Sequence, residues 1–199
     1  MKKAALHNLG CKVNAYETEA MQHLLEEAGY EIVPFTQKAD VYVINTCSVT
    51  NMADRKSRQM LHKAKKNNPD SIVVAAGCYV QTSEKEVLND LSVDIVIGND
   101  RKHDLVRLLE EYSLDSVNDT VDDINDGKHD FEELFIDQTK EHTRAFIKVQ
   151  DGCNQFCSYC IIPYARGRIR YRAMQEILKE VRELTANGYQ EIVLTGIHL

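Results

Sequence analysis

DVYVINTC, residues 40–47, is the stretch that best indicates how this chain folds. Its apolar run is continuous and rich in β-branched residues, which is typical of a strand buried on both faces. Similar runs are KAALHNLG at 3–10, SIVVAAGC at 71–78 and VDIVIGN at 93–99. Helical patterns follow these four runs near 15–29, 52–66, 83–91 and 102–112. The sequence therefore predicts an α/β sandwich domain in which a parallel sheet is covered by helices.

A strongly acidic stretch follows, and residues 115–143 hold ten acids against two bases. Because it has few large apolar residues, we expect a linker or a solvated excursion. Strand and helix patterns then resume at 144–153, 173–188 and 190–199. These patterns predict a first domain at 1–114, an acidic linker at 115–142 and a second domain at 143–199. A β/α barrel needs eight strand and helix units and about 250 residues, so we interpret the second domain as the opening units of a truncated barrel.

The composition excludes some classes of protein. No run of about eighteen apolar residues indicates a membrane span, and the N-terminus lacks the apolar core of a signal peptide. We therefore expect a cytoplasmic protein, in which thiols stay reduced and serve as ligands or nucleophiles. The net charge of −7 comes from the acidic stretch, so a polyanionic partner of the remaining chain is not excluded.

Three of the six cysteines, Cys11, Cys47 and Cys78, follow three of the predicted strands. Because parallel strands end at a shared edge, we expect these thiols to converge there. Convergent thiolates are typical of zinc or iron–sulfur sites. His7 could complete a tetrahedral zinc site, whereas three thiolates on a [4Fe–4S] cluster leave one iron open. The alternative is that each cysteine is a small buried apolar residue.

The other three cysteines, Cys153, Cys157 and Cys160, lie in CNQFCSYC with the spacing C-x3-C-x2-C, and Tyr159 precedes the last. This motif, directly after a strand that opens a barrel, resembles the signature of radical S-adenosylmethionine enzymes. The longer stretch GCNQFCSYCIIPYARGRIRYR at 152–172 resembles the methylthiotransferase branch of that superfamily. LGCKVNAYETEA at 9–20, INTCSVTNMADRKSRQ at 44–59 and AAGCYVQ at 75–81 resemble the cysteine motifs of its N-terminal domain.

The motifs are most similar to those of family members that act on threonylcarbamoyladenosine in tRNA. The sequence departs from the family pattern at Tyr171, where serine is usual. Family members also continue through a whole barrel to a small RNA-binding domain. The resemblance therefore implies a tRNA-modifying transferase, and alternatives are methylthiolation of isopentenyladenosine in tRNA, methylthiolation of a ribosomal protein, or an incomplete fragment that only binds clusters.

The resemblance also implies two [4Fe–4S] clusters and S-adenosylmethionine. The cysteines of CNQFCSYC would hold the cluster that binds S-adenosylmethionine, and the dispersed cysteines would hold an auxiliary cluster that carries the inserted sulfur. Tyr159 would lie near the adenine of the cofactor and Gly196 near its methionine moiety, although Tyr159 could simply pack under the loop and Gly196 could be an ordinary strand-end glycine. No catalytic residue beyond the cluster ligands is implied.

The implied partners are tRNA and a reductant such as flavodoxin or ferredoxin. The sheet edge of the first domain is expected to dock over the barrel mouth, so that the two clusters face each other. Two basic stretches are available for RNA. One holds Arg55, Lys56, Arg58, Lys63, Lys65 and Lys66, and the other holds Arg166, Arg168, Arg170 and Arg172. The four arginines occupy every second position, so an extended strand would point them all one way, toward phosphate or substrate. A solvated charged face is the alternative explanation for either stretch.

Overall fold

The computed structural model describes residues 1–112, 118–127, 129–136 and 144–199. Its main sheet has six strands, all parallel, in the order β2-β1-β3-β4-β5-β6. The strands are β1 (Lys3–Asn8), β2 (Glu31–Ile32), β3 (Val41–Thr46), β4 (Ile72–Gly77), β5 (Ile95–Ile97) and β6 (Asn118–Thr120). The four predicted strands correspond to β1, β3, β4 and β5, which confirms the parallel α/β sheet.

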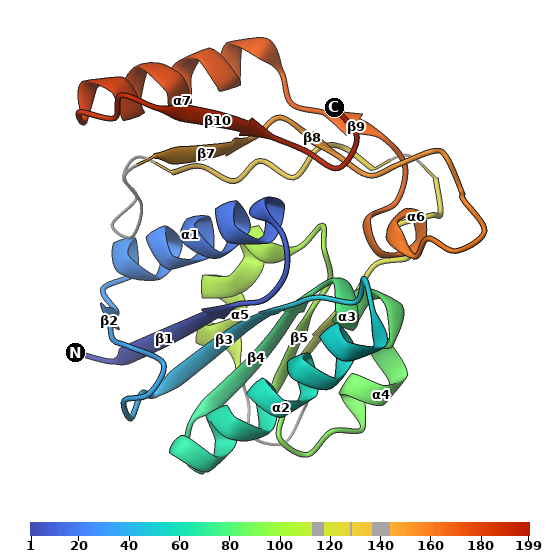
Figure 1. Ribbon diagram of the computed structural model, residues 1–199. Coiled ribbons are helices and arrows are strands. Elements are labelled where there is room, and N and C mark those ends of the chain that lie inside the picture. The colour runs from blue at the N-terminus through green and yellow to red at the C-terminus, as the bar shows by residue number, and fades with distance from the viewer. Residues whose placement is uncertain (113–117, 128, 137–143) are drawn as a thin grey trace.

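Helices cover both faces of this sheet (Figure 1). They are α1 (Lys12–Glu27), α2 (Asn51–Asn67), α3 (Cys78–Thr82), α4 (Glu84–Leu88) and α5 (Leu105–Glu111), and the short 3-10 turn η1 (Lys102–Asp104) precedes α5. Helices α2, α3 and α4 pack on one face, where Leu61 and Val80 meet Ile44 of β3. Helices α1 and α5 pack on the other, where Met21 and Leu108 lie in a second cluster. No helix in the described ranges has the length and apolar character needed to cross a membrane.

The second part of the chain forms a smaller layer above α1 (Figure 1). Strands β7 (Ala145–Lys148) and β10 (Ile192–Thr195) pair in parallel, and α7 (Met174–Ala186) packs on them through Leu184. Strands β8 (Gln150–Asp151) and β9 (Arg170–Tyr171) pair antiparallel, and α6 (Ile162–Arg166) lies between them in the sequence. Met174 and Leu178 of α7 and Leu194 of β10 are exposed. This is the uncovered apolar surface expected of the opening units of a barrel.

Part of the acidic stretch is packed against the protein. Leu134 and Ile136 are buried against Tyr16 and Ala20 on the face of α1 turned away from the main sheet. Ile124 is also buried, and β6 adds a strand beside β5. The expectation of a solvated excursion is therefore wrong for these buried apolar residues, whereas several acids of the same stretch are exposed, namely Asp122, Asp123, Asp126, Asp130 and Glu133. The domain boundaries stay predictions.

Candidate functional site

The first three cysteines follow three neighbouring strands, as the topology predicts. Cys47 comes directly after β3, Cys78 directly after β4, and Cys11 three residues after β1. Strand pairing sets Asn8 beside Asn45 and Thr46 beside Gly77, so the strands end almost level. Cys47 and Cys78 are buried and Cys11 is exposed.

The loop before Cys11 closes over Cys47. Gly10 has a φ of +107°, and a Cβ there would lie 2.9 Å from the Sγ of Cys47. Only glycine tolerates both the backbone conformation and the contact. The Cys11 loop and the Cys47 thiol are therefore in contact, whereas the His7 ring packs against Phe35 at 5.0 Å between centroids.

Two buried asparagines contact the first cysteine set. The Oδ1 of Asn14 accepts a hydrogen bond from the thiol of Cys11 at 3.7 Å. The Nδ2 of Asn99 donates to the Sγ of Cys78, also at 3.7 Å. Burial raises the pKa of the Cys78 thiol, although Arg166 and Asn99 act in the opposite direction.

The second cysteine set lies in the loop between β8 and α6. Cys153 is buried, Cys160 is partly buried and Cys157 is exposed. Phe156 has a φ of 47°, a left-handed conformation that is uncommon for a residue with a side chain. Tyr159 is 90% exposed and so does not pack under the loop.

Gly196 follows β10 at the same edge as the end of β7. A Cβ there would lie 2.9 Å from the Oε1 of Gln150. That oxygen accepts hydrogen bonds from the backbone N–H groups of Ile197 and His198, each at 2.8 Å. Gly196 thus permits a close approach of backbone and side chain beside the second cysteine set, and its role toward a cofactor remains a prediction.

The donor set fits iron–sulfur clusters in its chemistry. All six cysteines are free thiols, three at one sheet edge and three in one loop. Thiolates are the ligands that such clusters use. Among the residues that the structure describes, no three cysteine, histidine, aspartate or glutamate side chains lie close enough together to hold a metal ion. The cysteines therefore share an edge and a loop without converging on one point.

A buried ionic cluster lies between the two cysteine sets. We call it the buried junction, and it consists of Glu17, Lys102, Lys148, Asp151 and Arg166. Arg166, the last residue of α6, donates hydrogen bonds to Glu17 of α1 at 2.9 and 3.1 Å. It also donates to Asp151, two residues before Cys153, at 3.0 and 3.1 Å. The junction thus joins the sheet domain to the loop of the second cysteine set.

The charges in the buried junction are compensated together with Glu132, a buried acid that lies 3.8 Å from Lys102, so that three bases face three acids. Burial alone would raise the pKa of Glu17, but Arg166, Lys102 and Lys148 hold it well below its usual range. Burial would likewise raise the pKa of Asp151, but Arg166 and Lys148 lower it to about 2. Both carboxylates are therefore charged at neutral pH and act as ion-pair partners rather than as proton acceptors.

The prediction that four alternating arginines face phosphate or substrate is wrong for three of them. Arg166 belongs to the buried junction, Arg170 pairs with Asp100 at 2.8 Å, and Arg172 pairs with Glu180. These three are buried, whereas Arg168 is exposed with its guanidinium 4.2 Å from the centroid of the Phe156 ring. The alternation suggested one extended strand, but Arg166 ends a helix and internal carboxylates neutralise the buried arginines.

Helix α2 keeps a basic exposed surface. Arg58 bonds to the hydroxyl of Tyr79 and Lys65 pairs with Asp94. Four other bases are exposed, namely Arg55, Lys56, Lys63 and Lys66. Arg55 and Lys56 lie in the first half of α2, eight and nine residues after Cys47, and Lys63 and Lys66 lie near the end of the helix. RNA contact through α2 stays a prediction.

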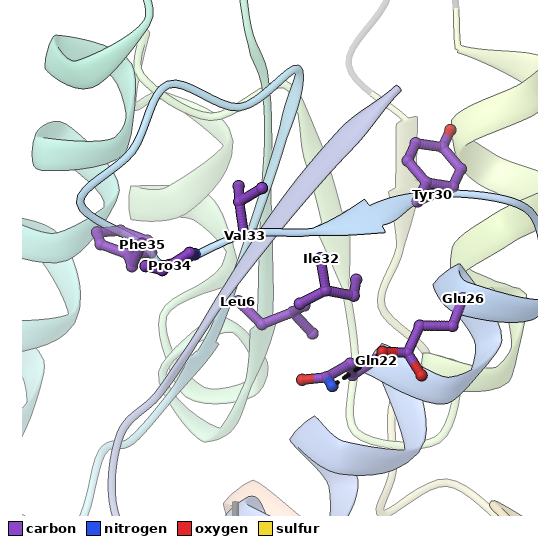
Figure 2. A pocket seen from close by; sticks show the side chains of 8 residues that line it. All are labelled: Leu6, Gln22, Glu26, Tyr30, Ile32, Val33, Pro34 and Phe35. Carbon is purple, nitrogen blue, oxygen red and sulfur yellow. Dashed lines mark hydrogen bonds between the residues drawn. The ribbon is translucent and has the colours of Figure 1, made fainter. Parts of the chain in front are cut away.

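A cavity of about 530 Å³ lies away from both cysteine sets. Figure 2 shows Gln22 and Glu26 of α1 on one side of it and Ile32 of β2 on the other. None of the predicted site residues lines it. It is therefore not the candidate site.

Comparison with known proteins shows which families the two parts of the chain resemble. Residues 3–98 match the uncharacterized protein family UPF0004, and residues 147–198 match the radical SAM superfamily. The chain is 47% identical over its whole length to the threonylcarbamoyladenosine tRNA methylthiotransferase of Bacillus subtilis, of which it covers 44%. It is 42% identical over 99% of its length to the Aquifex aeolicus protein of the same name, covering 48% of that protein.

A relative with a different printed substrate also matches. The chain is 34% identical over 98% of its length to the tRNA-2-methylthio-N(6)-dimethylallyladenosine synthase of Bacillus mycoides, of which it covers 39%. The chain thus spans less than half the length of each of these relatives. Residues 147–198 thus carry a radical SAM domain, and the chain as a whole is similar to proteins named as tRNA methylthiotransferases.

Proposed function

We propose that this chain carries the cluster-binding part of a tRNA methylthiotransferase that converts N6-threonylcarbamoyladenosine beside the anticodon to its 2-methylthio derivative. The observation that carries this proposal is the packing of α3, which begins at Cys78, against α6, which follows the second cysteine loop. Asn99 bridges the two sides, because its Nδ2 lies 3.7 Å from the Sγ of Cys78 and 2.6 Å from the carbonyl oxygen of Ala165. Two cysteine sets at one junction suit a reaction that needs two clusters.

The cysteines would divide between two [4Fe–4S] clusters. Cys153, Cys157 and Cys160 would hold the cluster at which S-adenosylmethionine binds. Cys11, Cys47 and Cys78 would hold the auxiliary cluster for sulfur. When bound, the first cluster and S-adenosylmethionine supply a 5′-deoxyadenosyl radical able to remove hydrogen from an adenine carbon, which no side-chain acid or base can do at neutral pH.

The protein's own residues would provide placement and shielding. The buried junction fixes the orientation of the two cysteine sets, and it does so without exposed charge because its acids and bases pair internally. Tyr159 is exposed beside the second set and is available to contact the adenine of the cofactor. Gly196 would leave room for the methionine moiety. Arg168 and the start of α2 supply exposed positive charge for tRNA phosphates.

The proposal is tested on the full-length protein that carries this chain, by anaerobic reconstitution with iron and sulfide. It is then incubated with a flavodoxin or dithionite, S-adenosylmethionine and tRNA that lacks the methylthio group. We expect 5′-deoxyadenosine and a methylthio mass on threonylcarbamoyladenosine. Isopentenyladenosine tRNA and ribosomal proteins are assayed in parallel, and methylthio mass on either of these instead would reassign the substrate.

Cysteine variants separate the two roles. Cys157→Ala should abolish 5′-deoxyadenosine formation, whereas Cys47→Ala should keep it and lose only the methylthio product. Absence of 5′-deoxyadenosine from the full-length protein with both clusters loaded would contradict the proposed activity and leave a protein that only binds clusters. A cytoplasmic location stays a prediction.

A further inference from the structure

Asn99 is fully buried at the point where the two cysteine sets approach each other. It follows β5 by two residues, at the carboxyl edge of the main sheet. Its Nδ2 group has two protons and two acceptors in reach, the Sγ of Cys78 and the carbonyl oxygen of Ala165 in α6. One side chain therefore contacts a cysteine of the first set and the helix that follows the second.

The orientation of the Asn99 amide is determined by its neighbours. Its Oδ1 accepts a hydrogen bond from the buried ammonium of Lys102 at 2.8 Å. An ammonium has no acceptor, so the oxygen must face Lys102 and the NH2 group must face Cys78 and Ala165. The contact between Asn99 and Cys78 is therefore an N–H···S interaction in which the amide donates.

Asn14, which contacts Cys11, differs from Asn99 in the atom that it turns toward the cysteine. Its Oδ1 accepts from Arg166 at 2.7 Å, and its Nδ2 donates to the carbonyl oxygens of Leu9 and Thr46, each at 2.8 Å. Both ends of this amide are occupied, and only its oxygen faces Cys11. A Cys11 thiolate would therefore receive no hydrogen bond from Asn14, whereas a Cys78 thiolate keeps its donor and is bound more strongly than the thiol.

We propose that Asn99 is a positioning residue that raises the reduction potential of the cluster held by the first cysteine set, through its hydrogen bond to Cys78. This inference rests on the proposed function. A hydrogen bond to a ligating sulfur stabilises the more negative reduced cluster over the oxidised one, so hydrogen bonds to the sulfurs tune the potential of iron–sulfur centres. Because the same amide bonds to Ala165, the potential depends on the docking of α6 against α3.

The test uses the chain with Cys153, Cys157 and Cys160 all replaced by alanine, so that only the first cysteine set can hold a cluster. Its midpoint potential is measured by redox titration with electron paramagnetic resonance detection. Asn99→Ala removes the donor without adding charge, and we expect the ratio of reduced to oxidised cluster at a fixed potential to fall about tenfold, equivalent to about 59 mV for one electron. Asn99→Asp should lower the potential further, because it also adds a negative charge.

Asn68→Asp is the matched control. Asn68 is a buried asparagine whose Nδ2 bonds to the carbonyl oxygen of Ala39 at 2.8 Å, away from the cysteines. The Asn68→Asp substitution should leave the midpoint potential of the cluster unchanged. An unchanged potential in Asn99→Ala with full iron content would overturn the inference while leaving the proposed function intact, whereas a triple-alanine chain that binds no iron would overturn the proposed function itself.

A second measurement tests whether an amide donates to the cluster, even if the Asn99 variants bind no iron. In the triple-alanine chain with Asn99 intact and asparagine labelled with 15N, pulsed electron paramagnetic resonance should detect hyperfine coupling between the reduced cluster and a side-chain nitrogen. Absence of this coupling from a chain with full iron content would show that no amide donates to the cluster and would refute the inference.

Discussion

Replacement of Arg166 by methionine removes the central cation of the buried junction. The guanidinium is fully buried and makes five hydrogen bonds, two to Glu17, two to Asp151 and one to Asn14. Methionine fills similar volume but carries no charge. Lys102 and Lys148 remain, so two bases then face the three carboxylates of Glu17, Asp151 and Glu132. They also lack the fork geometry that a guanidinium provides.

The expected loss of stability in Arg166→Met follows from the burial of the charges that it leaves behind. Breaking a buried ion pair by removing one partner costs about 3–5 kcal/mol, because the remaining charge is left uncompensated. For a chain of this size, 1 kcal/mol lowers the melting temperature by roughly 2–4 °C, so Arg166→Met should melt about 6–20 °C lower. The control is Arg168→Met, two residues along, which loses only an exposed contact with Phe156 and should change stability by about 1 kcal/mol or less.

The assay is thermal and urea unfolding followed by circular dichroism. A second variant tests the cause, because adding Asp151→Asn to Arg166→Met removes the one carboxylate in excess and leaves two bases facing Glu17 and Glu132. The double variant should recover part of the lost stability. If Arg166→Met costs no more than Arg168→Met, or if the double variant is the sum of its two single changes, the compensated-charge account of the junction is refuted.

Three further predictions concern the pH dependence of stability, the backbone at Gly152 and the binding of tRNA. Burial would raise the pKa of Asp151 from 3.8, but neighbouring cations hold it at about 2, and such a depressed pKa stabilises the fold above about pH 4. The free energy of unfolding measured in urea should therefore fall by roughly 2 kcal/mol as the pH drops toward 2, and Asp151→Asn should flatten this dependence. Gly152→Ala would place a Cβ 2.0 Å from the carbonyl oxygen of Arg168 at a φ of +73°; we expect a loss of more than about 2 kcal/mol, and unchanged thermal unfolding would show the loop to be differently built. Charge reversal of Arg55 and Lys56 together should weaken tRNA binding and reduce its salt dependence without lowering iron content, whereas unchanged filter-binding curves would exclude this end of α2 from the RNA interface.

Much of the sheet and of the cysteine placement could be predicted from local sequence. The β-branched runs of β3, β4 and β5 and the short apolar run of β1 predicted buried parallel strands, and parallel topology alone then put Cys11, Cys47 and Cys78 at one edge. Strands β2 and β6 have two and three residues, which is too short for any periodic signal.

The buried junction could not be predicted in the same way. Its acids and bases come from five separate segments, and ion pairing between distant segments leaves no periodic trace. One signal was available, since Lys148 interrupts the apolar run AFIKV of a strand that is buried, and a lysine there needs an acidic partner. The arginines near 170 were misassigned because alternation shows which side chains share a direction but not whether that direction is inward.

We propose two separate cluster sites in this chain, one for each cysteine set. Iron and sulfide are therefore counted after anaerobic reconstitution of the unmodified chain, of the chain with Cys11, Cys47 and Cys78 replaced by alanine, and of the chain with Cys153, Cys157 and Cys160 replaced. We predict about eight irons per chain in the first and about four in each of the others. Zinc in place of iron, or loss of all iron from either triple variant, would contradict two independent sites.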